Sequence, residues 1–485
     1  MDGKGKHMRA LITRRLGRTG RQVTTLGLGG QASIQWPAAG VDPAAIIEKA
    51  YRLGINYMDT SNIYGSSQKH FGEAFRRLGL SPAAANYDFA ARKRLFIASK
   101  THIRTARRPK GQHFRTDFSE GMTDGFGVST AVDDVRRSLS LLFGDGKGGY
   151  PEGAYLDSIQ FHDLNTMDEI DMLFEGFDDP QPNREWLGAL AALLDLRQGT
   201  NRSGCNPGRE KLVRHIGITG HWNTAAHIYA VQRDSQRVLD TLLVTVNPSD
   251  GKYMPHRYNA ISVAAAAGMG VIGMKVFADA AYYHKEAKFS DSPDDVYHGV
   301  GSPELPSDDL IRYALSVEGV STLIVGIGCI DDDADRCQLV RNLTAAQLAE
   351  PLSQDRMSVI EDRVTAAGRD RANASFQRRA VGLTAPRNVG VEADRSMPML
   401  GRKAIRITWD TAYAGLAPIE RYDVLRNGTV IGSVPHTPQF TSRRFHFDDL
   451  FTEVGLSDLH GYSVRAVDTA GAAVESLAQT ADPGT

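Results

Sequence analysis

Between Ala10 and Ala367, short apolar runs alternate with stretches in which apolar residues recur every three or four positions. The runs predict buried β-strands, and the recurrence predicts amphipathic helices. A polar turn at residues 17–20 predicts a hairpin before the first strand. The eight strands predicted by the apolar runs are 25–30, 54–58, 94–100, 156–161, 215–218, 242–246, 270–274 and 321–325. Helical patterns follow them at 43–53, 71–78, 130–142, 186–196, 224–232, 260–267, 308–316 and 331–366.

This alternation of strands and helices implies a parallel sheet, and eight units predict a closed (β/α)8 TIM barrel of the α/β class. An open doubly wound sheet is the alternative. Its Gly-x-Gly-x-x-Gly turn is missing after the first strand, where the sequence reads Leu28-Gly29-Gly30-Gln31. Residues 102–128 are rich in Arg, Lys, His and Gly without a helical period, so we expect a loop inserted after the third strand.

Beyond Pro386 the helical period gives way to alternation with period two. The pair Asn427-Gly428 joins two of these short strands and is a strong hairpin signal. About 100 residues of such strands predict an all-β immunoglobulin-like sandwich. We therefore expect two domains, a barrel with an N-terminal hairpin and long loops at 1–378 and a sandwich at 384–485. Trp409 and the strand from Tyr462 to Asp468 resemble those of a fibronectin type III domain.

The composition is that of an ordinary soluble protein, with 23% charged and 41% hydrophobic residues. A net charge of −1 gives no reason to expect nucleic acid or an anionic membrane as a partner. The three cysteines fit neither a disulfide framework nor a metal site, and no apolar run has the length of a signal peptide or a membrane span. A cytoplasmic enzyme is the expected class.

Polar residues stand where three consecutive predicted strands end. Asp59 and Tyr64 follow the second strand, Lys100 ends the third, and His162 follows the fourth. Strand ends in such a barrel converge on one mouth, so these four side chains are expected to meet. An ammonium group beside a phenol should lower the phenol's pKa from about 10, while a carboxylate holds the ammonium. Such a site can protonate a carbonyl oxygen or deprotonate an alcohol, and a cofactor must supply the hydride.

The same residues carry a family resemblance. Asp59-Thr-Ser-Asn-Ile-Tyr64-Gly, Ser99-Lys100-Thr101 and Leu156-Asp-Ser-Ile-Gln-Phe-His162 resemble the catalytic segments of the aldo-keto reductases. Ile216-Gly-Ile-Thr-Gly-His221, Gly270-Val-Ile-Gly-Met-Lys275 and Leu323-Ile-Val-Gly-Ile-Gly328 are similar to segments of a bacterial branch of that family. The resemblance runs from about Arg14 to Ala367. It implies that Tyr64 is the general acid/base, that Lys100 and Asp59 set its pKa, and that His162 orients the substrate.

The resemblance also implies a nicotinamide cofactor, NADP(H) or sometimes NAD(H), extended across the mouth. The positions it assigns to the cofactor are Thr219, Gly220, His221, Thr245, Met274, Lys275, Val276, Phe277, Gly326, Ile327, Gly328, Arg336, Arg341 and Asn342. Thr245 replaces a common glutamine and Met274 a common aromatic residue. Gln338 stands where the family usually has an arginine for the 2′-phosphate. Arg336 and Arg341 flank it and favour NADP(H) over NAD(H).

The loops point to the substrate less directly. Trp36, Tyr282 and Tyr283 are candidates for the substrate pocket, and their rings would suit a sugar or another cyclic substrate. His221 either contacts the cofactor or caps the helix that follows it. The inserted loop either grips an anionic substrate or, the favoured alternative, is a solvated or interface loop. Its basic residues are Arg104, Arg107, Arg108, Lys110 and Arg115.

The leading hypothesis is an NAD(P)(H)-dependent oxidoreductase that interconverts a carbonyl and an alcohol, with Tyr64 as general acid/base and no metal. The alternative is a cofactor-sensing or scaffold barrel whose sandwich binds a protein or polysaccharide. A barrel hydrolase using Asp59 and Asp163 would leave Tyr64 and Lys100 without a role. The sandwich is also a candidate surface for homo-oligomer contacts, and the sequence does not identify the substrate.

Overall fold

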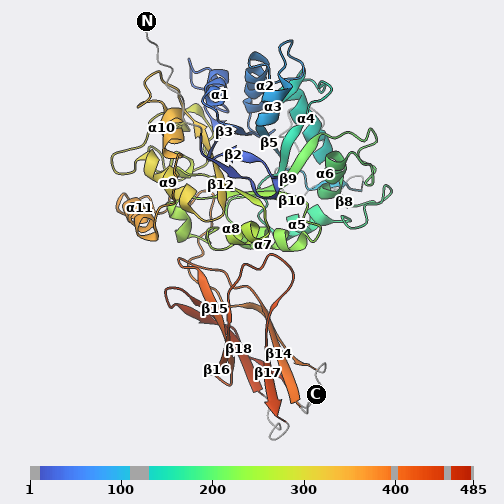
Figure 1. Ribbon diagram of the computed structural model, residues 1–485, viewed down its shortest axis with the longest axis vertical. Coiled ribbons are helices and arrows are strands. Elements are labelled where there is room, and N and C mark those ends of the chain that lie inside the picture. Colours follow the sequence, from blue (N-terminus) through green and yellow to red (C-terminus); the bar gives the residue numbers. More distant parts are fainter. Residues whose placement is uncertain (1–10, 110–129, 395–401, 453–459, 482–485) are drawn as a thin grey trace.

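The protein is described by a computed structural model that covers residues 11–109, 130–394, 402–452 and 460–481. Within these residues, eight parallel strands close into a barrel, which confirms the predicted fold class and excludes the open sheet (Figure 1). Most of these strands are buried along their whole length, which explains why they read as continuous runs. The barrel strands are β3 (Leu26–Ala32), β4 (Tyr57–Asp59), β5 (Phe96–Thr101), β7 (Leu156–Phe161), β9 (Val213–Gly220), β10 (Leu239–Thr245), β11 (Gly270–Met274) and β12 (Val320–Ile327).

Helices surround this barrel, and capping residues fix where several of them begin. Asp42 caps the first helix, in which Pro43 is the first residue, and Thr130 and Asp133 form a capping box on α4. The helices are α1 (Pro43–Arg52), α2 (Ser67–Arg77), α3 (Phe89–Arg94), α4 (Ala131–Phe143), α5 (Met167–Phe174), α6 (Ala189–Gln198), α7 (Thr224–Arg233), α8 (Ala260–Ala266), α9 (Ser307–Ser316), α10 (Gln338–Ala345) and α11 (Gln354–Ala366). None of the described helices has both the length and the apolar composition needed to cross a membrane.

The predicted N-terminal hairpin is present and closes the lower end of the barrel. Strands β1 (Thr13–Arg15) and β2 (Gln22–Thr24) pair antiparallel around the short helix η1 (Gly17–Thr19). Leu16 and Val23 are fully buried there against side chains from the barrel interior. Gly17 has a φ of +47°, and a Cβ at this position would lie 2.2 Å from the backbone nitrogen of Gly270. Only glycine therefore lets the hairpin approach β11 this closely.

Of the inserted loop expected at 102–128, the structure describes only residues 102–109, and these include a short strand. Strand β6 (Thr105–Arg107) pairs with β8 (Leu187–Gly188), so residues 187–188 are extended, whereas the sequence predicted helix from Trp186. Helix α5 was not predicted, because it is short. Its capping box joins Thr166 and Glu169.

Two antiparallel sheets follow the barrel and make up the predicted β-sandwich. One sheet has β13 (Arg387–Asp394), β14 (Arg402–Asp410) and β17 (Phe445–Thr452), and the other has β15 (Ile419–Arg426), β16 (Thr429–Pro435), β18 (His460–Asp468), β19 (Ala473–Glu475) and β20 (Gln479–Ala481). Trp409 is fully buried and packs against the rings of Tyr422 and Phe445. Asn427 and Gly428 both have positive φ in the β15–β16 turn, as the hairpin signal predicts.

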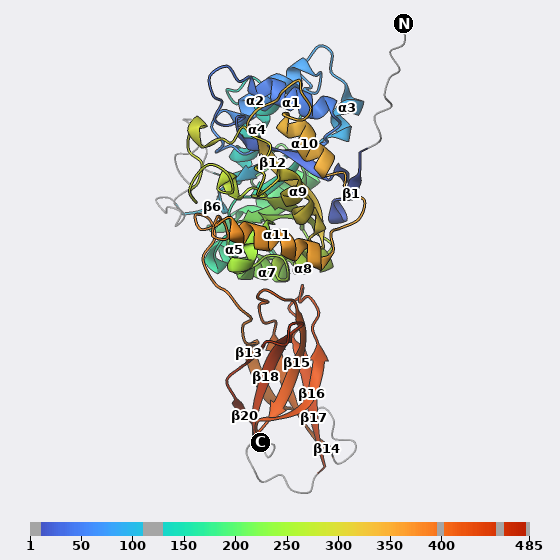
Figure 2. The same cartoon turned by 90° about the vertical axis from the view of Figure 1, so that its left-hand side faces the viewer.

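The sandwich lies against the side of the barrel that carries α7 and α8 (Figures 1 and 2). The amide of Asn259 donates to the backbone oxygen of Ala414 at 3.0 Å and accepts from its nitrogen at 2.8 Å. Gln232 donates to the backbone oxygen of Gln439 at 2.8 Å. Between α11 and β13 the chain passes the barrel mouth, where Asn373 and Gln377 bond to Asn247 and Asp250.

Candidate active site

A buried ion pair lies at the bottom of the barrel mouth. Asp59 is the last residue of β4, and Lys100 lies near the end of the neighbouring β5. Lys100 Nζ donates to Asp59 Oδ1 and, at 2.9 Å, to the backbone oxygen of Thr60. Both side chains are about 1% exposed. Burial raises the pKa of Asp59 and lowers that of Lys100, and the attraction between the two charges opposes both shifts.

Tyr64 stands above this ion pair on the loop after β4. Lys100 Nζ lies 4.8 Å from the centre of the Tyr64 ring. The sequence predicted that this ammonium lowers the phenol's pKa, and that direction is wrong in this structure. Burial, followed by the negative charges of Asp59 and Asp163, raises the pKa of Tyr64 well above 10. Tyr64 is therefore a protonated phenol at neutral pH.

His162 completes the group from the end of β7. Its Nε2 lies 3.5 Å from the Tyr64 hydroxyl, and its Nδ1 lies 3.4 Å from Ser61 Oγ. The ring of His102 packs on it with centres 4.3 Å apart. Burial and then the charges of His102 and Lys100 lower the pKa of His162 well below 6.5, so its imidazole is neutral. We call Asp59, Tyr64, Lys100 and His162 the floor of the cleft.

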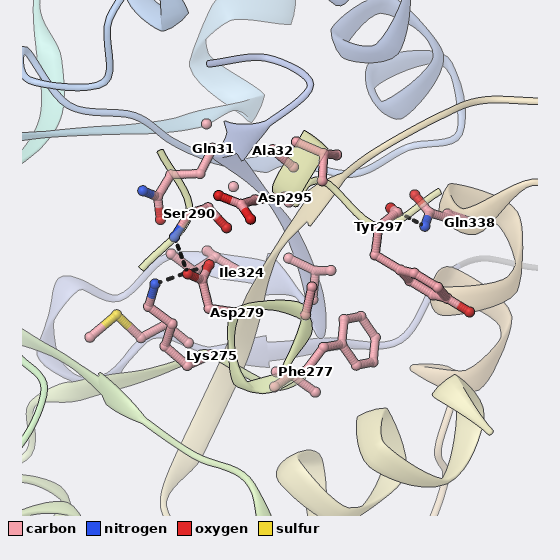
Figure 3. Close-up of a pocket in the computed structure, with 18 of the residues that line it drawn as sticks. Gln31, Ala32, Lys275, Phe277, Asp279, Ser290, Asp295, Tyr297, Ile324 and Gln338 are labelled. Atoms are coloured by element: carbon pink, nitrogen blue, oxygen red, sulfur yellow. Dashed lines mark hydrogen bonds and ion pairs between the residues drawn. The ribbon is translucent and has the colours of Figure 1, made fainter. Parts of the chain in front are cut away.

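A cleft runs from Tyr64 across the mouth to α10, and Figure 3 shows part of its lining. Seven of the fourteen predicted cofactor residues line it, namely His221, Met274, Lys275, Val276, Phe277, Gly326 and Asn342. The other seven, Thr219, Gly220, Thr245, Ile327, Gly328, Arg336 and Arg341, are not among its lining residues. Thr219 is buried and accepts a hydrogen bond from the nitrogen of Asp163 at 2.9 Å, while Thr245 is fully buried.

The arginines that were expected to favour a 2′-phosphate point elsewhere. Arg336 is 71% exposed and pairs with Asp331 at 3.1 Å. Arg341 pairs with Asp308 at 3.2 Å. Gln338 lines the cleft instead, and its oxygen accepts from the nitrogen of Gly328 at 2.7 Å. Its nitrogen donates to the backbone oxygens of Tyr297 and Gly299, so Gln338 fastens the loop after β11 (Figure 3).

That loop, residues 275–299, supplies the largest group of lining residues that the sequence did not predict. We call it the rim. Asp279 accepts from the nitrogen of Ser290 at 2.7 Å and pairs with Lys275 at 3.4 Å and Lys285 at 3.3 Å (Figure 3). These cations outweigh burial and lower the pKa of Asp279 to about 2. The other rim residues in the lining that were missed are Ala280, Ser290, Asp295, Val296, Tyr297 and Gly299, and Gly29, Gly30, Gln31 and Ala32 were missed at the end of β3.

The three predicted substrate residues do not share one location. Trp36 and Tyr283 line the cleft. Tyr282 is buried away from it, and its hydroxyl bonds to Ser249 and Asn247. Tyr282 is therefore a packing residue.

The basic segment after β5 has a structural role where it is described. Arg104 is buried, pairs with Glu169 at 3.0 Å and donates to the backbone oxygen of His162 at 2.6 Å. Arg107 donates to backbone oxygens of Arg184 and Ser203. Neither of the two predicted roles, a solvated or interface loop or the binding of an anionic substrate, describes these two arginines. Lys110 and Arg115 lie outside the described residues.

The fold and floor thus define a (β/α)8 barrel with an ionisable cluster at the carboxyl ends of its strands. Residues 25–299, more than half of the chain, match the Aldo/keto reductase family, and the chain belongs to that family. It is 39% identical over 75 residues to an L-galactose dehydrogenase from Arabidopsis thaliana, a match that spans 15% of this chain and 24% of that protein.

Among solved structures, two aldo-keto reductases from Klebsiella pneumoniae are similar to it. One, in complex with NADPH, is 16% identical with a TM-score of 0.44, covering 73% of this chain and 95% of that one. The other, in complex with NADP and acetate, is 15% identical with a TM-score of 0.42, covering 76% and 98%.

Proposed function

We propose that the protein is an NADP(H)-dependent oxidoreductase that interconverts a carbonyl and an alcohol, with Tyr64 as general acid and base. One observation carries the proposal. A protonated phenol lies between a buried ammonium group, Lys100, and a neutral imidazole, His162, at the end of a cleft. Membership of the Aldo/keto reductase family supports the same chemistry.

Held in the cleft, a nicotinamide cofactor would supply the hydride for reduction of the carbonyl carbon. Tyr64 donates its proton to the carbonyl oxygen, and the positive charge of Lys100 stabilises the phenolate that remains. Asp59 keeps Lys100 in place beneath the ring. His162, neutral in this site, hydrogen-bonds the substrate oxygen and orients it toward Tyr64. In the reverse direction the phenolate accepts the proton of the alcohol.

The lining of the cleft fits a dinucleotide. It offers one ammonium group at Lys275, amide side chains at Gln338 and Asn342, and apolar side chains at Met274 and Phe277. Such a mixture suits a ligand that carries both phosphates and flat rings. The choice of NADP(H) rests on the family, since Arg336 and Arg341 do not line the cleft. NAD(H) is the comparison cofactor in each test.

Tyr64→Phe tests the proposal, because it removes only the hydroxyl. Turnover of an aldehyde and aldose panel, followed by cofactor absorbance, should fall by about 10²- to 10⁴-fold. NADPH binding, followed by fluorescence, should change little. Tyr229→Phe, on the outer helix α7, is the matched control. Unchanged turnover in Tyr64→Phe rejects the assigned acid, and binding of neither NADPH nor NADH rejects the function.

We also infer that the chain divides into domains 1–378 and 384–485 and that the second is a fibronectin type III-like module for binding a partner. The bonds from Asn259 to Ala414 support a fixed attachment to the barrel. Truncation before residue 384 tests this division. An active barrel would leave the sandwich as a separate binding module, whereas lost activity would make it part of the enzyme.

A further inference from the structure

An aspartate–histidine pair lies beside the floor and is not used in the proton transfer described above. Asp163 directly follows His162, and His221 directly follows β9. His221 Nδ1 lies 2.6 Å from Asp163 Oδ1. His221 also lines the cleft together with Tyr64 and Trp36. The pair therefore connects a partly buried carboxylate to the space in which a substrate must bind.

Asp163 is held rigidly enough to fix the imidazole. Its φ is +58°, its nitrogen donates to Thr219 Oγ1, and its backbone oxygen accepts from Asn165 at 3.1 Å. Burial tends to raise the pKa of Asp163, but the charge and hydrogen bond of His221 outweigh it and lower that pKa below its usual range. The carboxylate is ionised and accepts the Nδ1 proton. Nδ1 therefore carries a proton, and Nε2 is the ring nitrogen left for another partner.

The imidazole is also held from its other sides. Its ring packs against Phe289 and Phe376, with ring centres 5.8 and 5.9 Å away. The backbone oxygen of His221 accepts from His256 Nε2 at 2.9 Å and from Gln377 Nε2 at 3.3 Å. Among the described residues, the only hydrogen-bond partner of the ring is Asp163 at Nδ1, which leaves Nε2 for a ligand in the cleft.

We infer that His221, fixed by Asp163, is a specificity-determining residue whose Nε2 hydrogen-bonds a substrate hydroxyl next to the reacting carbonyl. The inference rests on the proposed function and narrows its substrate class to hydroxylated carbonyl compounds such as aldoses. A hydroxyl both donates and accepts, so it can pair with Nε2 whether or not that nitrogen carries a proton. The ring of Trp36, in the same lining, offers an apolar face for the carbon skeleton of such a substrate.

Glycolaldehyde and acetaldehyde test the inference, because they differ by one hydroxyl on the adjacent carbon. With NADPH, the wild-type protein should favour glycolaldehyde in kcat/KM. His221→Leu should lower that preference by about tenfold, the usual consequence of losing one buried hydrogen bond to a substrate. The loss in kcat/KM should be larger for glycolaldehyde than for acetaldehyde. NADPH affinity, measured by fluorescence, separates this effect from any contact of His221 with the cofactor.

Two further variants separate the hydrogen bond from packing. His221→Gln keeps an acceptor oxygen and should recover part of the preference. Asp163→Asn keeps the shape of the carboxylate but no longer requires a proton on Nδ1, so it should weaken the preference as His221→Leu does. His446→Leu, at an exposed histidine on β17, is the matched control.

Imidazole ¹⁵N spectra give a readout that does not depend on turnover. They should show His221 protonated at Nδ1, with Nε2 shifting when glycolaldehyde is added. No shift of Nε2 at saturation overturns the inference. Equal losses for both aldehydes, or weaker NADPH binding with an unchanged preference, also overturn it. A wild-type protein that binds neither NADPH nor NADH instead refutes the proposed function.

Discussion

The floor and the rim of the cleft hold their charges in different ways. On the floor one ammonium, Lys100, meets one carboxylate, Asp59, and both side chains are about 1% exposed on adjoining strands. On the rim one carboxylate, Asp279, is shared by Lys275 and Lys285, on a loop. Besides Asp59, Lys100 Nζ has only the backbone oxygen of Thr60 as a hydrogen-bond partner among the described residues. A carboxylate shared by two cations can lose one and keep the other.

The backbone of the floor and the backbone of the rim also differ. Asp59, Lys100 and His162 lie at or directly after the ends of the barrel strands β4, β5 and β7, and Tyr64 lies on the loop after β4. The rim contains three consecutive residues other than glycine in the left-handed region, Ala278, Asp279 and Ala280. Each such residue costs about 1–2 kcal/mol relative to a right-handed conformation. The comparison indicates that the floor residues are already held in place for the reaction, whereas the rim above them has a strained backbone that can change conformation.

Lys100→Met should have the largest effect, because it leaves Asp59 buried without a counterion. The free energy of unfolding should fall by about 3–5 kcal/mol, and turnover should be lost. Urea denaturation measures the first effect. The double variant Asp59→Asn with Lys100→Met should regain much of the stability but none of the turnover. If Lys100→Met is nearly as stable as the wild type, then losing the ion pair of the floor costs no more than losing one ion pair of the rim.

Lowering the pH should destabilise the folded protein through His102, whose ring packs on His162 of the floor. Burial, followed by the charge of Arg104, lowers the pKa of His102 to about 3. Between pH 6.5 and 3, His102 is protonated in the unfolded chain but neutral in the folded chain. The free energy of unfolding therefore falls as the pH falls through this window. The slope from one such group approaches about 1.4 kcal/mol per pH unit. Urea denaturation at pH 7, 6 and 5 should show a steeper loss for the wild type than for His102→Gln.

Ala280→Gly should stabilise the rim by about 1 kcal/mol, because glycine adopts a φ of +68° without the Cβ clash. Thermal unfolding should show a small rise in Tm. The same exchange in a helix, Ala45→Gly in α1, should cost about 1 kcal/mol. Destabilisation by both changes would mean that the left-handed run is not strained.

Arg336→Ala and Arg341→Ala should have the smallest effect. Both arginines sit in solvent-accessible ion pairs with aspartates, and such pairs contribute about 0–1 kcal/mol. The Kd for NADPH should change by less than about threefold in each variant. A tenfold weakening by either change would place that arginine on the 2′-phosphate.

The same division explains what could be predicted from sequence. Strands of a closed barrel end at one mouth, so the order of Asp59, Lys100 and His162 along the chain was enough to expect them together; their catalytic roles stay predictions. The rim was not predictable, because no glycine marks the left-handed run and Asp279 meets Ser290 only through the folded loop. Arg104 was misjudged because a buried, paired arginine and a solvated one look alike in a sequence.

The hairpin beneath the barrel determines how ligands exchange. With Leu16 and Val23 sealing the lower end, whatever enters the cleft must depart through the same opening. A molecule resting on the floor is trapped for as long as another lies above it. The order in which two ligands bind and leave therefore follows from how deep each one lies in the cleft. Slow release of the deeper ligand would limit the rate of repeated turnover.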